Sequence, residues 1–198
     1  MRIIAGTKRG MKLLSPKGMD TRPITDRVKE SLFNVLYNYD MPQDRTVADL
    51  FCGTGSLGLE ALSRGAKEVA FVDNNPKVVA ILNRNIAKAG FVAESKVITA
   101  NVLKIGAAVA SGQAKCELVF VDPPYKMTED VGTGSPVAQL LGLICDQVTD
   151  DAIVVIRTHH HTNLLDEYGQ LRIIDRRRWG TMAVTLLRLK RQEAERFD

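Results

Sequence analysis

The sequence predicts an α/β protein with a mostly parallel, seven-stranded sheet and helices on both faces. From residue 46 to about residue 160, short apolar segments alternate with amphipathic ones, and the apolar segments are almost continuously hydrophobic. Strands of a parallel sheet are buried on both faces and are joined by helical crossovers, which produces this pattern. After about residue 160, two strand-like segments follow one another directly and predict an antiparallel edge.

The elements follow in order from the apolar periodicity and its terminators. We expect a hairpin arm over residues 1–20, a leading helix within residues 21–40 capped by Thr25 or Asp26, and a core over residues 41–190. The predicted strands of the core are 46–51, 68–72, 96–100, 118–121, 152–156, 170–175 and 181–189. The predicted helices are 57–64, 77–89, 103–111 and 136–147, and residues 191–198 are expected to be a tail.

Length and composition fit one domain in a reducing compartment. The 198 residues are 45% hydrophobic and 25% charged, as is typical of globular proteins. No apolar run approaches the ~20 residues that span a bilayer, and the N-terminus lacks the apolar centre of a signal peptide. Cys52, Cys116 and Cys145 have no paired or metal-type spacing. We therefore expect a cytoplasmic protein without disulfide, membrane segment or metal.

The N-terminal region carries more positive charge than the rest of the chain. Residues 1–30 hold eight basic and three acidic side chains, a net charge of +5, whereas the whole chain has +4. A basic arm on a nearly neutral body favours phosphate contacts with a nucleic acid, and a merely solvated surface is an equally good interpretation. We expect the arm to lie beside the cofactor cleft.

A glycine-rich loop joins the first predicted strand to the following helix. Gly53, Gly55 and Gly58 match G-x-G-x-x-G, and Asp73 ends the next strand 20 residues after Gly53. Such glycines allow a nucleotide to approach the backbone, and the acid accepts from ribose hydroxyls. Asp49 lies before the loop, where a carboxylate opposes a pyrophosphate and suits the cationic groups of S-adenosylmethionine. The loop thus favours S-adenosylmethionine over NAD without deciding between them.

Asp122-Pro123-Pro124-Tyr125 follows the fourth predicted strand, at the edge where the glycine loop also opens. Exocyclic amines of bases are poor nucleophiles because their lone pair is delocalised into the ring. A carboxylate and a proline-fixed carbonyl can accept from the amine and localise the lone pair, and an aromatic ring can stack on a flipped base. The motif therefore predicts methyl transfer to a base amine, with Asp122, Pro123, Pro124 and Tyr125 as catalytic residues.

With these motifs the chain resembles class I S-adenosylmethionine-dependent methyltransferases of the D-P-P-Y type. It resembles more narrowly the RsmD-like family, the bacterial small-subunit (16S) ribosomal RNA guanine-N2 methyltransferases, most specifically over residues 21–34 and 57–66. The resemblance covers almost the whole chain. It implies a Rossmann-like class I methyltransferase fold, S-adenosyl-L-methionine as cofactor with S-adenosyl-L-homocysteine as product, and no metal. The implied substrate is a guanine N2 amine in 16S rRNA within an assembling 30S particle, with no obligate protein partner.

The resemblance also implies roles for individual residues. Asp49, Gly53 and Gly55 would hold the methionine end of the cofactor. Asp73 would hold the ribose, and Asn101 with Val102 the adenine. Their neighbours Phe51, Cys52 and Asn74 are included among the expected cofactor contacts. The expected RNA contacts are Lys8, Arg9, Lys12, Arg22, Arg27, Arg177 and Trp179.

Four further features are assigned no role in methyl transfer. Arg157-Thr158 stands where relatives frequently have an acid, and Trp179-Gly180 replaces a more usual Tyr-Gly; we expect both to affect RNA docking and neither to touch the methyl-transfer residues. Residues 159–161 are consecutive histidines, which are expected not to converge and to form a solvated loop. Cys52 has no histidine placed as a base and is expected to be an apolar filler beside the cofactor.

Three alternative functions remain open. The same chemistry could serve the N6 amine of adenine in DNA, although the chain has no separate domain to recognise a DNA sequence. An NAD-dependent oxidoreductase would share the glycine loop, although Asp49 and the lack of a placed proton donor argue against it. A non-catalytic RNA-binding assembly factor could use the same fold, and the intact D-P-P-Y motif argues against that.

Overall fold

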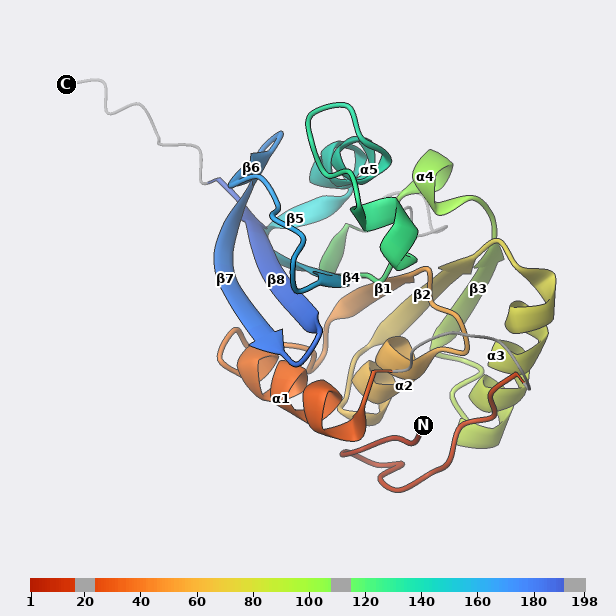
Figure 1. Cartoon of the computed structure of the whole chain (residues 1–198). Helices are drawn as coiled ribbons and strands as arrows, with labels where there is room; N and C mark the ends of the chain where they lie inside the picture. The colour runs from red at the N-terminus through yellow and green to blue at the C-terminus, as the bar shows by residue number, and fades with distance from the viewer. Residues whose placement is uncertain (17–23, 108–114, 191–198) are drawn as a thin grey trace.

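The computed structural model describes residues 1–16, 24–107 and 115–190, which form one sheet covered by helices (Figure 1). The strands are β1 Thr46–Leu50, β2 Glu68–Asp73, β3 Ser95–Thr99, β4 Cys116–Val121, β5 Val148–His159, β6 Glu167–Tyr168, β7 Leu171–Trp179 and β8 Met182–Leu189. The helices are α1 Asp26–Tyr37, α2 Ser56–Ser63, α3 Pro76–Ala89, α4 Val102–Ile105 and α5 Pro136–Cys145, with a 3-10 turn, η1, at Tyr125–Thr128.

The sheet has the order β3-β2-β1-β4-β5-β8-β7-β6. Neighbours from β3 to β5 pair in parallel, and the remaining pairs are antiparallel. The predicted fold class is confirmed, but the sheet has eight strands and not seven. The additional strand, β6, pairs Tyr168 with Leu171 of β7. Two residues are too short to show a hydrophobic period, so the sequence pattern did not reveal this strand.

Helices cover both faces of the sheet (Figure 1). α1, α2 and α3 lie on one face, where Phe33 and Leu82 pack in one buried cluster with Phe120 of β4. α4 and α5 lie on the other face, where Leu141 packs in a second cluster with Val154 of β5. Full burial of each such side chain stabilises the fold by about 1.5–3 kcal/mol. Burial from both sides explains why every residue of β1 is buried, and why the last four residues of β4, Leu118–Val121, are all apolar.

The predicted boundaries hold for most elements. Thr25 caps α1, since its hydroxyl accepts from the Val28 amide at 3.4 Å. The hairpin arm is present as a β-bridge between Arg2 and Lys12. α4 ends at Ile105, earlier than predicted, and the predicted continuation to residue 111 and the tail at 191–198 lie outside the described residues. Within the described ranges, no helix combines the length and apolarity needed to cross a bilayer.

A buried ion pair ties the arm to α1 and α2. Lys29 Nζ lies 3.2 Å from Glu60 Oε2, with the two side chains 1% and 0% exposed, and it donates to the Arg2 carbonyl at 2.7 Å. Glu60 also accepts from the Ile4 and Ala5 amides at 2.7 and 3.0 Å, and its Oε1 accepts from the Arg64 side chain at 2.8 Å. Burial lowers the pKa of Lys29, and Glu60 opposes that shift. This arm network, formed by Lys29, Glu60, Arg64 and the backbone of residues 2, 4 and 5, fixes the arm to the body.

Candidate active site

A cavity of about 500 Å³ opens at the carboxyl ends of the parallel strands. The loops after β1 and β4 meet there, because Leu50 and Val121 at the ends of these strands are register partners. Ligands of open α/β sheets bind at this edge, in cavities of this size. The predicted cofactor and catalytic residues that line the cavity are Asp49, Phe51, Cys52, Gly53, Asp73, Asn74, Asp122, Pro123, Pro124 and Tyr125. Further lining residues are Met1, Pro16, Ile24, Thr54, Ser56, Leu57, Asn75, Val78 and Arg157.

The loop between β1 and α2 depends on glycine for two different reasons. Gly55 has φ +85°, and a Cβ there would lie 2.4 Å from Leu82 Cδ1, so both backbone conformation and space require glycine. A Cβ on Gly58 would lie 2.3 Å from the Phe71 ring, so this glycine lets α2 pack closely on β2. The loop therefore exposes its backbone to the cavity while α2 remains close to the sheet.

Asp49 is a buried carboxyl with one oxygen unpaired. Its Oδ2 accepts from the Gly58 amide at 2.8 Å, whereas Oδ1 is buried and has no hydrogen-bond partner among the described residues. Burial raises the pKa of Asp49 well above its usual range, and the nearby Asp122 and Asp73 raise it further. A buried acceptor without a partner is costly, so the site suits a ligand that brings a cationic donor.

Asp73 holds the glycine loop in place. It ends β2, and its two carboxylate oxygens accept from the Gly53 amide at 3.0 Å and from the Asn75 amide at 2.9 Å. Asn75 in turn caps α3, since its side chain accepts from the Lys77 amide at 3.1 Å. The sequence pattern predicted a carboxylate at this place, but not its bond to the loop that it faces.

Asp122 forms an ion pair with Arg157. The Arg157 Nε donates to Asp122 Oδ1, and the two side chains are 15% and 19% exposed. Burial raises the pKa of Asp122, and the Arg157 guanidinium opposes that rise. The expectation that Arg157 would not touch the methyl-transfer residues is therefore wrong. The parallel register pairs Val121 with Ile156, so the next residues, Asp122 and Arg157, are neighbours. A prediction that β4 and β5 are adjacent strands could therefore have revealed the ion pair.

Tyr125 is the first residue of η1, and it is half-buried. Its ring centroid lies 5.7 Å from that of His159, at an interplanar angle of 87°. Its hydroxyl is buried and has no hydrogen-bond partner among the described residues. An edge-to-face contact of this kind fixes the plane of the tyrosine ring.

The three histidines at the end of β5, His159 to His161, come together, contrary to expectation. Ring centroids of His160 and His161 are 3.7 Å apart, and those of His159 and His160 are 4.5 Å apart. One possible ligand atom from each of the three lies within 4.8 Å of the others. The chain turns immediately after the strand, since the Thr162 amide donates to the His159 carbonyl at 3.0 Å, and a turn gathers side chains that an extended strand would alternate. That the site needs no metal stays a prediction.

Among the predicted cofactor residues, Gly55, Asn101 and Val102 do not line the cavity, whereas Cys52 does. Asn101 is exposed and caps α4 by accepting from the Leu103 amide at 3.0 Å, and neither it nor the buried Val102 lines the cavity. Their role at the adenine stays a prediction. Cys52 lines the cavity, and burial raises the pKa of its thiol well above the usual range. A thiol that resists ionisation is a poor nucleophile, in agreement with a filler role.

Of the described arm residues 1–16, only the first and the last line the cavity. Met1 and Pro16 line the cavity, whereas the turn between them runs along α2 and α3 to their far ends. There the Lys8 amide donates to the Ser63 hydroxyl at 2.9 Å, and Lys8 Nζ lies 5.7 Å from the centroid of the Phe91 ring. Since α2 and α3 begin at the carboxyl edge of the sheet, their last residues lie at the opposite edge. The expectation that the arm lies beside the cleft is thus wrong for its basic turn.

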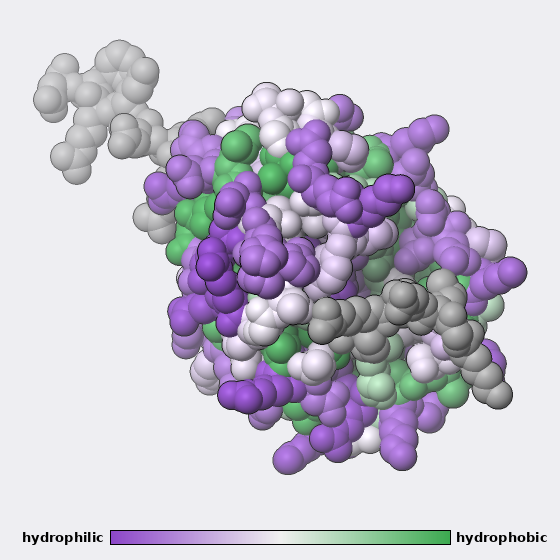
Figure 2. Space-filling view, in the orientation of Figure 1, coloured by the Kyte–Doolittle hydropathy of each residue, from purple (hydrophilic) through white to green (hydrophobic). Residues whose placement is uncertain are grey.

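The other predicted RNA contacts are dispersed. Arg9, Lys12 and Arg27 are exposed on the arm and α1, and Arg22 lies outside the described residues. Arg177 is exposed on β7, where its Nε is 2.9 Å from Asp175 Oδ2. Trp179 is half-buried and packs against the core, so it is not a free stacking surface. Figure 2 shows that hydrophilic residues cover most of this face of the molecule, including the part over β7 on the left.

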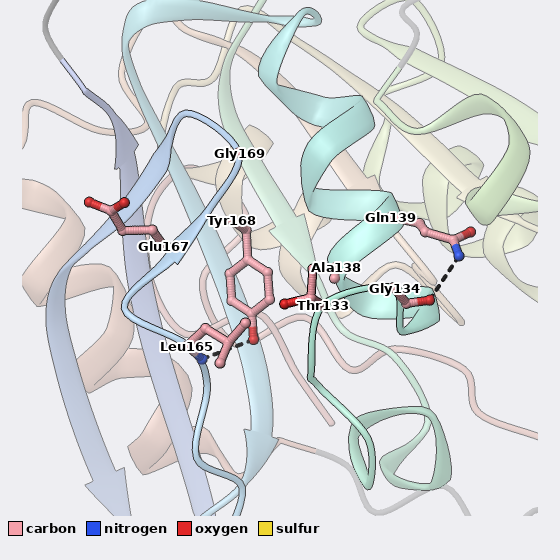
Figure 3. A pocket seen from close by; sticks show the side chains of 8 residues that line it. All are labelled: Thr133, Gly134, Ala138, Gln139, Leu165, Glu167, Tyr168 and Gly169. Carbon is pink, nitrogen blue, oxygen red and sulfur yellow. Dashed lines mark hydrogen bonds between the residues drawn. The ribbon is translucent and has the colours of Figure 1, made fainter.

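A second cavity, of about 220 Å³, lies between the start of α5 and the β6–β7 turn (Figure 3). The Tyr168 hydroxyl at its wall accepts from the Leu165 amide at 3.1 Å and donates to the Val131 carbonyl at 2.8 Å. Gln139 Nε2 donates to the Gly134 carbonyl at 2.8 Å. None of the described residues of this wall leaves a buried side-chain polar atom unpaired. By contrast, three residues that line the larger cavity, Asp49, Tyr125 and Arg157, each leave a buried side-chain polar atom unpaired.

Comparison with known proteins identifies relatives over nearly the whole chain. The family model described as conserved hypothetical protein 95 matches residues 1–188. A relative in Bacillus subtilis strain 168, described as a candidate rRNA methyltransferase, is 31% identical over 188 residues, which cover 94% of this chain and 97% of that protein. Ribosomal RNA small subunit methyltransferase D of Escherichia coli K12 is 39% identical over 128 residues, which cover 64% of this chain and 61% of that protein.

A solved structure from Escherichia coli, described as a candidate methyltransferase, has a TM-score of 0.78 and 30% identity to this chain. The match covers 97% of this chain and 99% of that structure. The chain therefore belongs to the conserved hypothetical protein 95 family, an RsmD-like family, and has a Rossmann-like class I methyltransferase fold.

Proposed function

We propose that this protein transfers a methyl group from S-adenosylmethionine to the N2 amine of a guanine in 16S rRNA of the small ribosomal subunit. The observation that carries the proposal is that the glycine loop and Asp122-Pro123-Pro124-Tyr125 line one cavity. The rRNA substrate is supported by the names of the relatives, which include ribosomal RNA small subunit methyltransferase D. The guanine N2 position rests on the family that the motifs resemble.

The cavity residues fit S-adenosylmethionine. The unpaired Asp49 Oδ1 would accept from the cofactor's ammonium group, and the Asp73 carboxylate would accept from its ribose hydroxyls. The Gly53 backbone, exposed beside them, leaves room for the methionine end. When bound, the cofactor supplies an electrophilic methyl group.

Asp122 would accept a hydrogen bond from the target amine. Its Oδ1 is occupied by Arg157, and its Oδ2 has no partner among the described residues, so Oδ2 is the acceptor for the amine. Accepting from the N–H localises the nitrogen lone pair toward the methyl donor, and the carboxylate stabilises the positive charge that develops on nitrogen. Alignment of the amine accounts for much of the remaining rate enhancement.

Tyr125 would hold the base after it leaves its own stack. The edge-to-face contact with His159 sets the plane of the ring before RNA binds, so little ordering is needed on binding. Stacking of a base on an aromatic side chain contributes about 1–3 kcal/mol. The base would be flipped out of the RNA, since the amine must reach a cavity at the sheet edge.

The test supplies S-adenosylmethionine with a labelled methyl group to naked 16S rRNA, to 30S particles and to duplex DNA in parallel. Mass spectrometry of the digested nucleosides is expected to find N2-methylguanosine in one of the RNA arms. N6-methyladenine in the DNA arm would overturn the proposed substrate. Binding of the cofactor in calorimetry without transfer in any arm would point to a non-catalytic assembly factor.

Two variants test the roles within the motif. Asp122→Asn is expected to lose methyl transfer by at least about 100-fold with cofactor affinity retained, because the neutral amide is a weaker acceptor for a cationic transition state. Tyr125→Phe should keep most of the rate and Tyr125→Ala should lose about 10-fold or more, as stacking requires. Equal losses in both tyrosine variants would assign the role to the hydroxyl instead.

A further inference from the structure

The Asp122–Arg157 ion pair differs from a second Arg–carboxylate pair at the other ends of neighbouring strands. Arg45 precedes β1, and its Nη1 lies 2.7 Å from Glu117 Oε1 near the start of β4. The second oxygen of Glu117 accepts from the Thr46 amide at 2.9 Å. Both oxygens of that carboxylate are therefore used inside the protein, as expected of a pair with a structural role.

At Asp122 only one oxygen is used. Arg157 Nε occupies Oδ1, and among the described residues Oδ2 accepts from nothing. Arg157 itself keeps a buried nitrogen, Nη1, without a partner. Asp122 Oδ2 is not among the buried unpaired atoms, and the Asp122 side chain is 19% exposed, so Oδ2 can be reached from the cavity. The arrangement leaves Oδ2 available at the cavity and orients it.

The charges around Asp122 make Arg157 the main counter-charge. The ionisable groups lining the cavity are Asp49, Cys52, Asp73, Tyr125, Arg157 and the α-amino group of Met1. Arg157 is the only lysine or arginine side chain among the described lining residues, and it is the group in contact with Asp122. Without it, Asp122 would be an acid in a largely acidic, water-poor setting, which favours the protonated form. A protonated carboxyl is a poor acceptor for the amine.

We propose that Arg157 is a positioning residue for methyl transfer, which keeps Asp122 ionised and fixes Oδ1 so that Oδ2 accepts from the target amine. This inference rests on the proposed function of Asp122. Arg157 itself need not touch the substrate.

The test measures kcat/KM of methyl transfer against pH for the wild-type protein, Arg157→Gln and Arg157→Lys, with Arg45→Gln as the matched control. At pH 7, Arg157→Gln is expected to lose about 10- to 100-fold, the range for loss of a charge-assisted hydrogen bond. The acid limb of its pH profile, where kcat/KM falls as the pH is lowered, should move to higher pH, because removing the cation raises the pKa of Asp122. Activity should therefore recover in part as the pH rises.

Arg157→Lys retains the positive charge and is expected to keep the wild-type acid limb with a smaller loss of rate. Arg45→Gln should leave both the limb and the rate unchanged, since that pair lies at the opposite edge of the sheet. A loss of rate that is uniform across pH in Arg157→Gln would show a merely structural role and overturn the proposal. An unchanged rate would overturn it as well.

A second measurement does not depend on activity. The side-chain carboxyl carbon of Asp122, assigned by its absence in Asp122→Asn, is titrated by carbon NMR in the wild-type protein and in Arg157→Gln. Its pKa should be higher in Arg157→Gln, and an unchanged pKa would overturn the proposal. If this pKa shift is observed but the wild-type protein methylates no nucleic acid, the proposed function fails, whereas the effect of Arg157 on the ionisation of Asp122 is supported. The two failures are therefore distinguishable.

Discussion

The arm network and the large cavity are both buried polar regions, and they differ in how completely their groups are paired. In the arm network, Lys29 Nζ contacts four acceptor atoms of Arg2, Ser56 and Glu60, and Glu60 accepts from two backbone amides as well as from Lys29 and Arg64. At the cavity, Asp49 Oδ1, Tyr125 OH and Arg157 Nη1 are buried without a partner among the described residues.

The difference indicates which region serves stability and which serves binding. A fully paired buried network rigidifies the structure, whereas unpaired buried groups that line a cavity reduce stability and are available to a ligand. The protein thus anchors its N-terminus with a network of paired groups and keeps unpaired polar groups at the carboxyl edge of the sheet. Substitutions in the two regions should consequently change different quantities.

The largest effect is expected in the arm network. Lys29→Met should lower the free energy of unfolding by about 3–5 kcal/mol, because Glu60 would keep its buried charge after losing the more deeply buried of its two cations. Urea denaturation measures this value. Arg45→Gln, which breaks a partly exposed pair, should cost less than about 1 kcal/mol. A cost for Lys29→Met as small as that of Arg45→Gln would remove the contrast between the two regions.

At the cavity, Asp73→Ala should act on binding. Loss of a charged acceptor for the ribose hydroxyls is expected to weaken the binding of S-adenosylmethionine by about 1–3 kcal/mol, as measured by calorimetry. Part of the effect would come through the loop, because the Gly53 amide loses its partner. Unchanged affinity would refute the ribose assignment. Arg45→Gln, at the opposite edge of the sheet, serves as the control and should bind the cofactor normally.

Asp49→Asn should stabilise the cofactor-free protein by about 1 kcal/mol at neutral pH, and it should weaken the binding of S-adenosylmethionine. The side-chain amide oxygen can still accept from the Gly58 amide. Burial raises the pKa of Asp49 in the folded state, so the folded protein holds the proton more tightly than the unfolded one. The wild-type protein therefore loses stability as the pH rises from the ordinary carboxyl pKa through the raised value, and the variant lacks that loss.

The measurement for Asp49→Asn is the melting temperature of both proteins over a range of pH from the acid to the mildly alkaline side. The advantage of the variant should be absent at the acid end and should grow with pH. An advantage that is constant across this range would mean that Asp49 ionisation does not contribute.

The smallest effect is expected at the basic turn of the arm. Neutralising Lys8, Arg9 and Lys12 together should weaken RNA binding and reduce its salt dependence by about one unit of slope for each phosphate that the variant no longer neutralises. Cofactor binding should remain unchanged, because the turn lies at the far ends of α2 and α3. A normal salt titration of methyl transfer by the triple variant would make the arm purely structural, like the network that anchors it.

Local sequence was enough for much of the fold and the site. The parallel α/β core was predictable because burial on both faces leaves apolar runs in the central strands, such as Leu118–Val121 of β4. The glycine loop and the residues after β4 were predictable because their chemistry requires particular residue types at neighbouring positions. The Thr25 cap was predictable for the same local reason.

What the tertiary structure decided concerns contacts between segments far apart in the chain. The Arg157–Asp122 pair comes from the register of β4 against β5, and the Lys29–Glu60 pair from the packing of α1 on α2. The gathering of the histidines depends on a turn that no periodicity marks, and the basic turn lies far from the cavity because the arm follows two helices to their ends. Residue type and local spacing are written along the chain, whereas register, helix packing and the pairing of buried charges depend on the energy of the whole assembled core.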